Sequence, residues 1–117
     1  MAHSPEKYLE DMINATGNVR AIIGSATLAE YCHSLTLRSA VERQLQITGE
    51  ALYNLERRHP SIAVRIVQHR EIVRFRHVLV HGYDIVDDPT VYAIATEKAP
   101  LLRIQVEELL KELMDAH

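Results

Sequence analysis

The chain has 117 residues, of which 47% are hydrophobic and 25% are charged, and it contains only four glycines and four prolines. These proportions are ordinary for a globular protein and exclude a disordered or fibrous chain, and the length suits a single domain over residues 1–117. The formal net charge of −3 argues against binding nucleic acid by overall attraction, although it is compatible with a local basic cleft.

The same inventory bears on the compartment. Cys32 is the single cysteine, so no internal disulfide can form and a reducing cytoplasm is expected. The first residues, MAHSPEKYLEDM, do not place a basic segment before an apolar one, so no signal peptide is predicted. Apolar runs are all far shorter than the ~20 residues that span a bilayer. We therefore expect a cytoplasmic protein with no membrane association.

The chain begins with a helical pattern. Residues 4–6, Ser-Pro-Glu, are typical of a helix start, and apolar residues then recur at helical spacing, which predicts a helix over residues 5–23. Gly24-Ser25 interrupts the pattern, and residues 27–33 suit a short helical turn.

A second long helix follows. Ser34 or Thr36 can cap it, and it is expected to end before His59-Pro60, because proline cannot continue a helix. Its predicted buried stripe consists of Leu37, Val41, Leu45, Thr48, Leu52 and Leu55.

The second half predicts two more long helices. One should run from Pro60-Ser61 to about Val80 and stop at Gly82. Asp88-Pro89 suits the start of a short helix, and Ala99-Pro100 should break or kink it before a last helix. The apolar residues of that last helix are Leu101, Leu102, Ile104, Val106, Leu109, Leu110 and Met114. The expected fold is all-α, an up-and-down four-helix bundle with one or two additional short helices.

Residues 74–84, RFRHVLVHGYD, hold an unusual density of basic and histidine side chains. On a helical wheel, Ile72, Phe75 and Leu79 share one face and mark the expected core side. A second stripe, nearly opposite, is polar and consists of Arg70, Arg74, His77 and His81. Arg76 lies about 140° from His81, so one regular helix does not aim both at one atom. Either Gly82 unwinds the last turn, or two copies of the helix meet.

The residues alone leave three interpretations open. The stripe can be a solvated polar face. His77 and His81 have the i, i+4 spacing of a metal pair, but no glutamate follows His77 and the obvious extra ligands, Cys32 and His33, are distant in sequence. The third interpretation is metal-free phosphodiester chemistry, in which an arginine binds phosphate and a histidine transfers protons.

At this point the sequence resembles a known family. Arg76 to Tyr83 is similar to the R-x-x-x-x-H-x-Y motif of the HEPN superfamily, in particular of HepT-like toxins, with the polar His77 after the arginine. The segments VERQLQITGEAL, HGYDIVDD and APLLRIQVEELL also resemble parts of that family in order and spacing, so the similarity covers most of the chain.

The resemblance implies a HEPN-like helical bundle that dimerises, as a homodimer or a higher oligomer, and so brings two Arg-His motifs into one cleft. It implies a metal-independent ribonuclease without cofactor, in which His81 is the general acid or base and Arg76 stabilises charge on the phosphorane-like transition state. His77 would orient or share the phosphate, and Arg70 and Arg74 would widen the positive rim for RNA.

The family also implies a partner and a modification. HepT-like toxins pair with a minimal nucleotidyltransferase antitoxin that adds AMP to the tyrosine of the motif, which matches Tyr83 here. The anionic adduct would block the cleft near His81. Glu50, in TGEAL, is a possible support for the site, since a carboxylate beside Arg76 would hold its guanidinium in place.

Two other functions remain open from the sequence. The protein can be a non-catalytic HEPN partner that binds nucleotide or the antitoxin, with Tyr83 as AMP acceptor, or a purely structural helical dimer. If Tyr83 has only a structural role, its ring packs at the end of the bundle.

Overall fold

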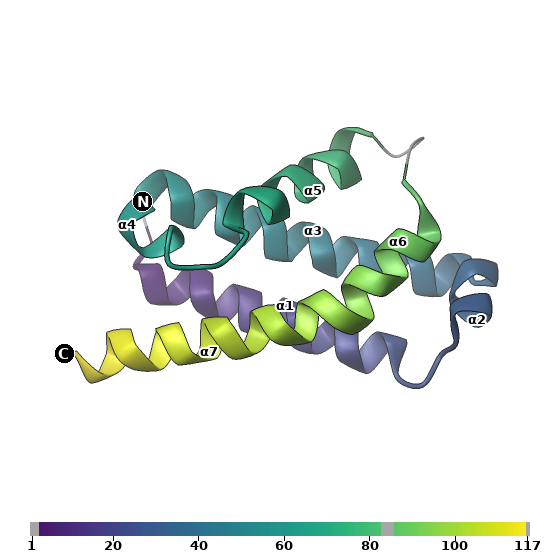
Figure 1. Cartoon of the computed structure of the whole chain (residues 1–117), viewed down its shortest axis with the longest axis horizontal. Helices are drawn as coiled ribbons and strands as arrows, with labels where there is room; N and C mark the ends of the chain where they lie inside the picture. Colours follow the sequence, from purple (N-terminus) through teal and green to yellow (C-terminus); the bar gives the residue numbers. More distant parts are fainter. Residues whose placement is uncertain (1–2, 83–85, 117) are drawn as a thin grey trace.

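The computed structural model describes residues 3–82 and 86–116, and within those ranges it contains helices and turns but no strand. The helices are α1 (Pro5–Ile23), α2 (Leu28–His33), α3 (Leu35–Arg58), α4 (Pro60–Ala63), α5 (His69–His81), α6 (Asp88–Ala93), the π-helical turn η2 (Ile94–Lys98) and α7 (Ala99–Asp115). The long helices α1, α3, α5 and α7 alternate in direction along the molecule (Figure 1), so the predicted all-α, up-and-down bundle is confirmed.

Local capping signals set the ends of the first helices as expected. Pro5 begins α1, and Gly24 ends it with a positive φ of 53°. The Thr27 hydroxyl accepts a hydrogen bond from the Glu30 N–H at 3.2 Å, while the Glu30 carboxylate accepts one from the Thr27 N–H at 2.9 Å. Ser34 caps α3. The predicted bounds of α1, α2 and α3 are therefore confirmed.

The core lies between α1, α3 and α7, since α1 packs against both of the other helices. All but one residue of the predicted α3 stripe are buried; Leu37 is half-buried. The buried residues form two clusters. One includes Leu9, Met12, Leu52, Leu55 and Val106, and the other includes Val19, Tyr31, Val41, Leu79 and Val91. On α7 three of the expected apolar residues are instead exposed: Leu101, Ile104 and Met114.

The predicted third helix is wrong in its first half. The continuous helix expected from Pro60 to Val80 is divided into α4 and α5 by turns at residues 64–68, and Gln68 adopts a left-handed φ of 64°. Ile66 is completely buried in this turn segment. The segment is also attached to α7: the Val67 N–H donates to Gln105 Oε1 at 2.6 Å, and Arg65 pairs with Glu112.

The expected break at Ala99-Pro100 has a different form. The chain stays helical through this point, and the wide turn η2 joins α6 to α7 (Figure 1). Pro100 has no backbone N–H, so one hydrogen bond of the helix is missing there. A π-helical turn is one way in which a helix adjusts its backbone hydrogen bonds around such a gap. In the described ranges, every helix is too short or too polar to cross a membrane.

Candidate functional site

Helix α5 exposes the polar stripe that the sequence predicts. Arg70, Arg74, His77 and His81 are all exposed. The two imidazole rings lie side by side, with centroids 4.7 Å apart and planes inclined by 49°. Within the described part of the chain, neither Arg70 nor Arg74 forms an ion pair, so both charges are available to an anion.

Arg76 turns toward α3 instead. Its Nη2 and Nε donate to Glu50 Oε2 at 2.6 and 3.1 Å, and its guanidinium carbon lies 5.5 Å from the centroid of the Tyr53 ring. The Arg76 side chain is 20% exposed and the Glu50 side chain 52% exposed, so the ion pair lies at the surface. Because a guanidinium carries five N–H donors, the Nη1 edge stays free of Glu50 and can bind a second anion.

A glycine permits this contact. A Cβ built on Gly49 would lie 2.2 Å from the Arg76 Cβ and 2.8 Å from its Cγ, which is too close for carbon atoms that are not bonded to each other. The lack of a side chain at Gly49 therefore lets α5 approach α3 closely at Arg76. At the end of α5, the Gln46 amide donates to the Leu79 carbonyl at 3.4 Å. The stem of Arg76 is consequently held on α3, while the histidines face solvent.

Arg76 and the histidine pair remain separate within one chain. No hydrogen bond joins Arg76 to His77 or His81 among the described residues. This agrees with the angular separation on the helical wheel. The described ranges also hold no group of three or more metal-ligating side chains, so Cys32 and His33 do not join the two histidines in such a group.

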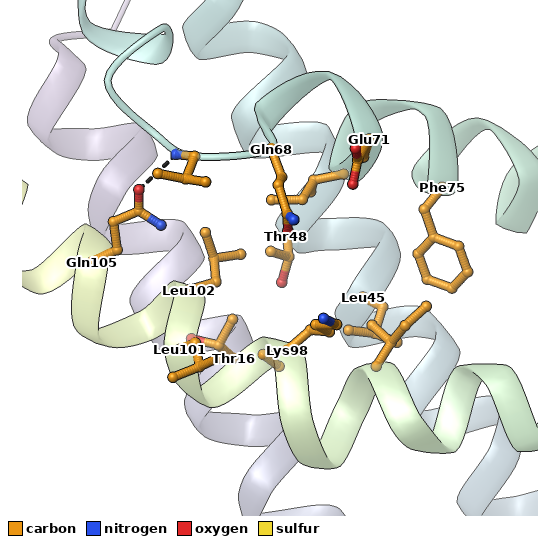
Figure 2. Close-up of a pocket in the computed structure, with 14 residues that line it drawn as sticks. Thr16, Leu45, Thr48, Gln68, Glu71, Phe75, Lys98, Leu101, Leu102 and Gln105 are labelled. Atoms are coloured by element: carbon orange, nitrogen blue, oxygen red, sulfur yellow. Dashed lines mark hydrogen bonds between the residues drawn. The ribbon is translucent and has the colours of Figure 1, made fainter.

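The opposite side of α5 lines a cavity. A hollow of about 460 Å³ is bounded by α3, α5 and the η2–α7 segment. Figure 2 shows Phe75 and Leu45 on one side of it and Leu102 on another. Of the three residues expected to face the core, Leu79 is buried, whereas Ile72 and Phe75 are only half-buried and line this hollow. The core face of α5 is therefore correctly predicted in direction but incompletely covered.

A second polar cluster lies where α3 meets α6. The Arg38 guanidinium donates to the Cys32 carbonyl at 2.6 Å, and its Nε lies 3.5 Å from Asp88 Oδ2. Burial raises the pKa of Glu42, the nearby negative charge of Asp88 raises it further, and Arg38 opposes the shift.

Tyr83, expected to accept AMP, lies outside the described residues.

Comparison with known proteins assigns a family. A family model described as ribonuclease HepT-like matches residues 12–109. The chain belongs to the HepT-like ribonuclease family. It is 30% identical over 115 residues to a Thermococcus cleftensis protein named "Probable ribonuclease HepT", covering 95% of this chain and all of that protein. Two Methanocaldococcus jannaschii proteins whose names class them as candidate RNases are each 26% identical to it, over 92% and 91% of this chain and 82% and 84% of their own lengths. No solved structure shows a significant match.

Membership of this family supports RNA cleavage as the activity and RNA as the substrate class, as the motif at Arg76–Tyr83 predicts. Sequence reasoning did not single out Gly49 or Tyr53, which the fold brings against Arg76. A glycine one residue before Glu50 in a helix was the available signal, since a helix interior favours alanine unless another backbone or side chain approaches.

Proposed function

We propose that this protein is a metal-independent endoribonuclease and the toxin of a toxin–antitoxin pair, with a composite Arg-His site shared by two copies of the chain. The observation that carries the proposal is the placement of Arg76: Glu50 holds its guanidinium near Tyr53, while His77 and His81 are exposed on another side of the same helix. Arginine and histidine supply the charge and the proton transfers that phosphodiester cleavage needs.

The proposed reaction uses the substrate's own 2′-hydroxyl. His81 removes the 2′-proton as the 2′-oxygen attacks phosphorus. The bond from phosphorus to the 5′-oxygen breaks, and that oxygen takes a proton from water. The Nη1 edge of Arg76 stabilises the charge on the phosphorane-like transition state. The products are a 2′,3′-cyclic phosphate and a 5′-hydroxyl. His77 orients the phosphate, Arg70 and Arg74 attract the strand, and Glu50 keeps Arg76 in place.

Two copies are proposed because the groups of one chain do not converge. A dimer that places His81 of one copy opposite Arg76 of the other would complete the site without unwinding α5. We further propose that a minimal nucleotidyltransferase antitoxin neutralises the site by adding AMP to Tyr83. The adduct would bring a phosphate next to the cationic groups of α5.

The direct test is cleavage of RNA by the unmodified protein in EDTA. Arg76→Ala and His81→Ala should each lower the cleavage rate by about 10²- to 10⁴-fold, because each removes one element of transition-state stabilisation or proton transfer. Arg20→Ala and His33→Ala are matched controls, since both residues are exposed and lie on other helices. Cleavage that persists in the first two variants would refute the site, and cleavage that requires a metal would refute the mechanism.

Co-expression of the two inactive variants tests the shared site. If Arg76 of one copy acts with His81 of the other, each mixed dimer regains one of its two sites. Equal mixing should then restore up to about a quarter of wild-type activity, because about half of the dimers are mixed. No recovery would place both residues of one site in the same chain. Intact-mass measurement after co-expression with a minimal nucleotidyltransferase tests AMP addition. If the protein accepts AMP but its unmodified form never cuts RNA, the non-catalytic alternative is favoured.

A further inference from the structure

A ribonuclease that acts on single strands needs a surface for bases as well as for phosphates. Single-stranded RNA is generally held by aromatic side chains that stack on the bases and by cations along the backbone. The chain has five tyrosines, one phenylalanine and no tryptophan, so the choice of stacking residues is small.

Most of these rings are occupied elsewhere. Tyr8 and Tyr31 are buried, Phe75 lines the cavity behind α5, and Tyr92 packs against Tyr31 while its hydroxyl donates to the Ala26 carbonyl at 2.7 Å. Among the described aromatic residues, Tyr53 alone lies beside Arg76. It is half-buried on α3, so part of the residue is accessible to solvent.

Two cations surround this ring. The guanidinium carbon of Arg76 lies 5.5 Å from the Tyr53 centroid, and that of Arg57 lies 5.6 Å from it. Their constraints differ. Glu50 holds Arg76, whereas Arg57 is exposed and forms no ion pair in the described part of the chain. Arg57 can therefore leave the ring at little cost, while Arg76 stays.

We infer that Tyr53 and Arg57 extend the candidate site along α3 as an RNA-binding surface: Tyr53 stacks on a base of the strand and Arg57 binds a neighbouring phosphate. The base takes the place of Arg57 over the ring, because a cation–π contact at an exposed site is weak and a stacked base buries more apolar surface. The inference rests on the proposed ribonuclease function and specifies its substrate as single-stranded RNA.

A purely structural role for Tyr53 makes a different prediction. Tyr53 and Arg57 are four residues apart on one helix, and such a pair can stabilise a helix by itself. Tyr53 can also prop Arg76 against α3. In both cases a Tyr53 substitution should change RNA binding by the same factor whichever base the strand carries, and also when the strand carries no base.

The experiment separates the two roles by measuring binding to two oligomers in a His81→Ala background, in which cleavage is expected to be slow. One probe is a fluorescein-labelled uridine 12-mer and the other is an abasic oligomer with the same number of phosphates. Tyr53→Leu should weaken binding of the uridine oligomer by about 5- to 100-fold and leave the abasic oligomer unchanged. Tyr53→Phe, which keeps the ring, should bind both oligomers as the parent does.

Arg57 has its own signature. Arg57→Met should weaken binding of both oligomers and lower the magnitude of the slope of log affinity against log salt by about 0.7, because one phosphate contact with a single strand is lost. Tyr53→Leu should leave that slope unchanged, since stacking releases no counterion. Thermal unfolding of each variant confirms that it is folded.

Other outcomes overturn the inference. Equal weakening of both oligomers by Tyr53→Leu would show that Tyr53 only positions Arg76, and no weakening at all would show that it contacts no base. The cleavage assay stays independent of this result. Loss of cleavage in Arg76→Ala together with unchanged uridine binding in Tyr53→Leu would refute the inference alone, whereas the absence of wild-type cleavage would refute the proposed function.

Discussion

The helices of the bundle differ in how deeply they are embedded. Helices α1 and α3 each bury seven residues along their length, whereas α5 buries only Leu79. One side of α5 packs on α3, another lines the cavity, and a third presents Arg70, Arg74 and the histidines to solvent. The helix with the candidate catalytic residues is thus the long helix with the smallest buried face. Segments that bind ligands often lie in the less stable parts of a fold, because they have few buried apolar contacts.

The largest expected effect tests this contrast in stability. Leu52→Ala removes side-chain volume from a completely buried position and should lower the free energy of unfolding by about 2–5 kcal/mol. Ile72→Ala removes a similar volume from a half-buried position beside existing empty space, so it should cost about 1 kcal/mol. Urea unfolding measures both, and equal losses would mean that α5 is as firmly embedded as α3.

The next effect concerns the contact of α5 with α3. Gly49→Ala should cost about 1–3 kcal/mol, because the new methyl group meets the Cβ of Arg76 and α5 must move away. RNA cleavage should fall further than the loss of stability explains. Gly17→Ala is the matched control: its Cβ would lie 3.4 Å from the flexible end of Arg103, so the gain in helix propensity should leave the protein equally or more stable. Unchanged cleavage in Gly49→Ala would show that the Arg76 position is not critical.

The smallest effect depends on pH and lies in the polar cluster away from α5. The folded protein raises the pKa of Glu42 above its ordinary value of 4.5, chiefly through burial. The neutral carboxyl is therefore favoured in the fold, and the stability that it contributes below pH 4.5 is lost as pH rises through the folded pKa. Glu42→Gln lacks this loss. Its stability relative to wild type should increase from pH 4 to pH 7, and a constant difference in thermal unfolding would contradict the shift.

Much of the fold was predictable because its signals are local. The capping residues Thr27 and Ser34 and the prolines at positions 5 and 60 determine helix starts through their immediate neighbours. The division of the third helix was not predictable in this way. Residues 64–68 contain neither glycine nor proline, and apolar residues continue at helical spacing across the turn, at Ile62, Ile66 and Val73. Tertiary burial of Ile66, rather than local preference, decides the conformation there.

The candidate site shows the same division. The exposed stripe of Arg70, Arg74, His77 and His81 follows from helical periodicity, and α5 presents it as expected. The contacts of Arg76 do not follow from periodicity. Its partner Glu50 is 26 positions away, and the sequence suggested Glu50 only through the family resemblance. Tyr53 had no signal at all, because a tyrosine within a helix is ordinary until the neighbouring helix is placed.

The attachment of α5 has a mechanical consequence. Its start is attached to α7 by the hydrogen bond from the Val67 N–H to Gln105, and beyond its end Val86 packs against the core cluster that includes Val91 of α6. Helix α5, with 13 residues, therefore covers roughly 20 Å between these two attachments. The turn at residues 64–68 therefore sets where α5 begins relative to α7. A residue inserted or deleted in that turn should move Arg76 away from Glu50 without altering any chemical group of the site.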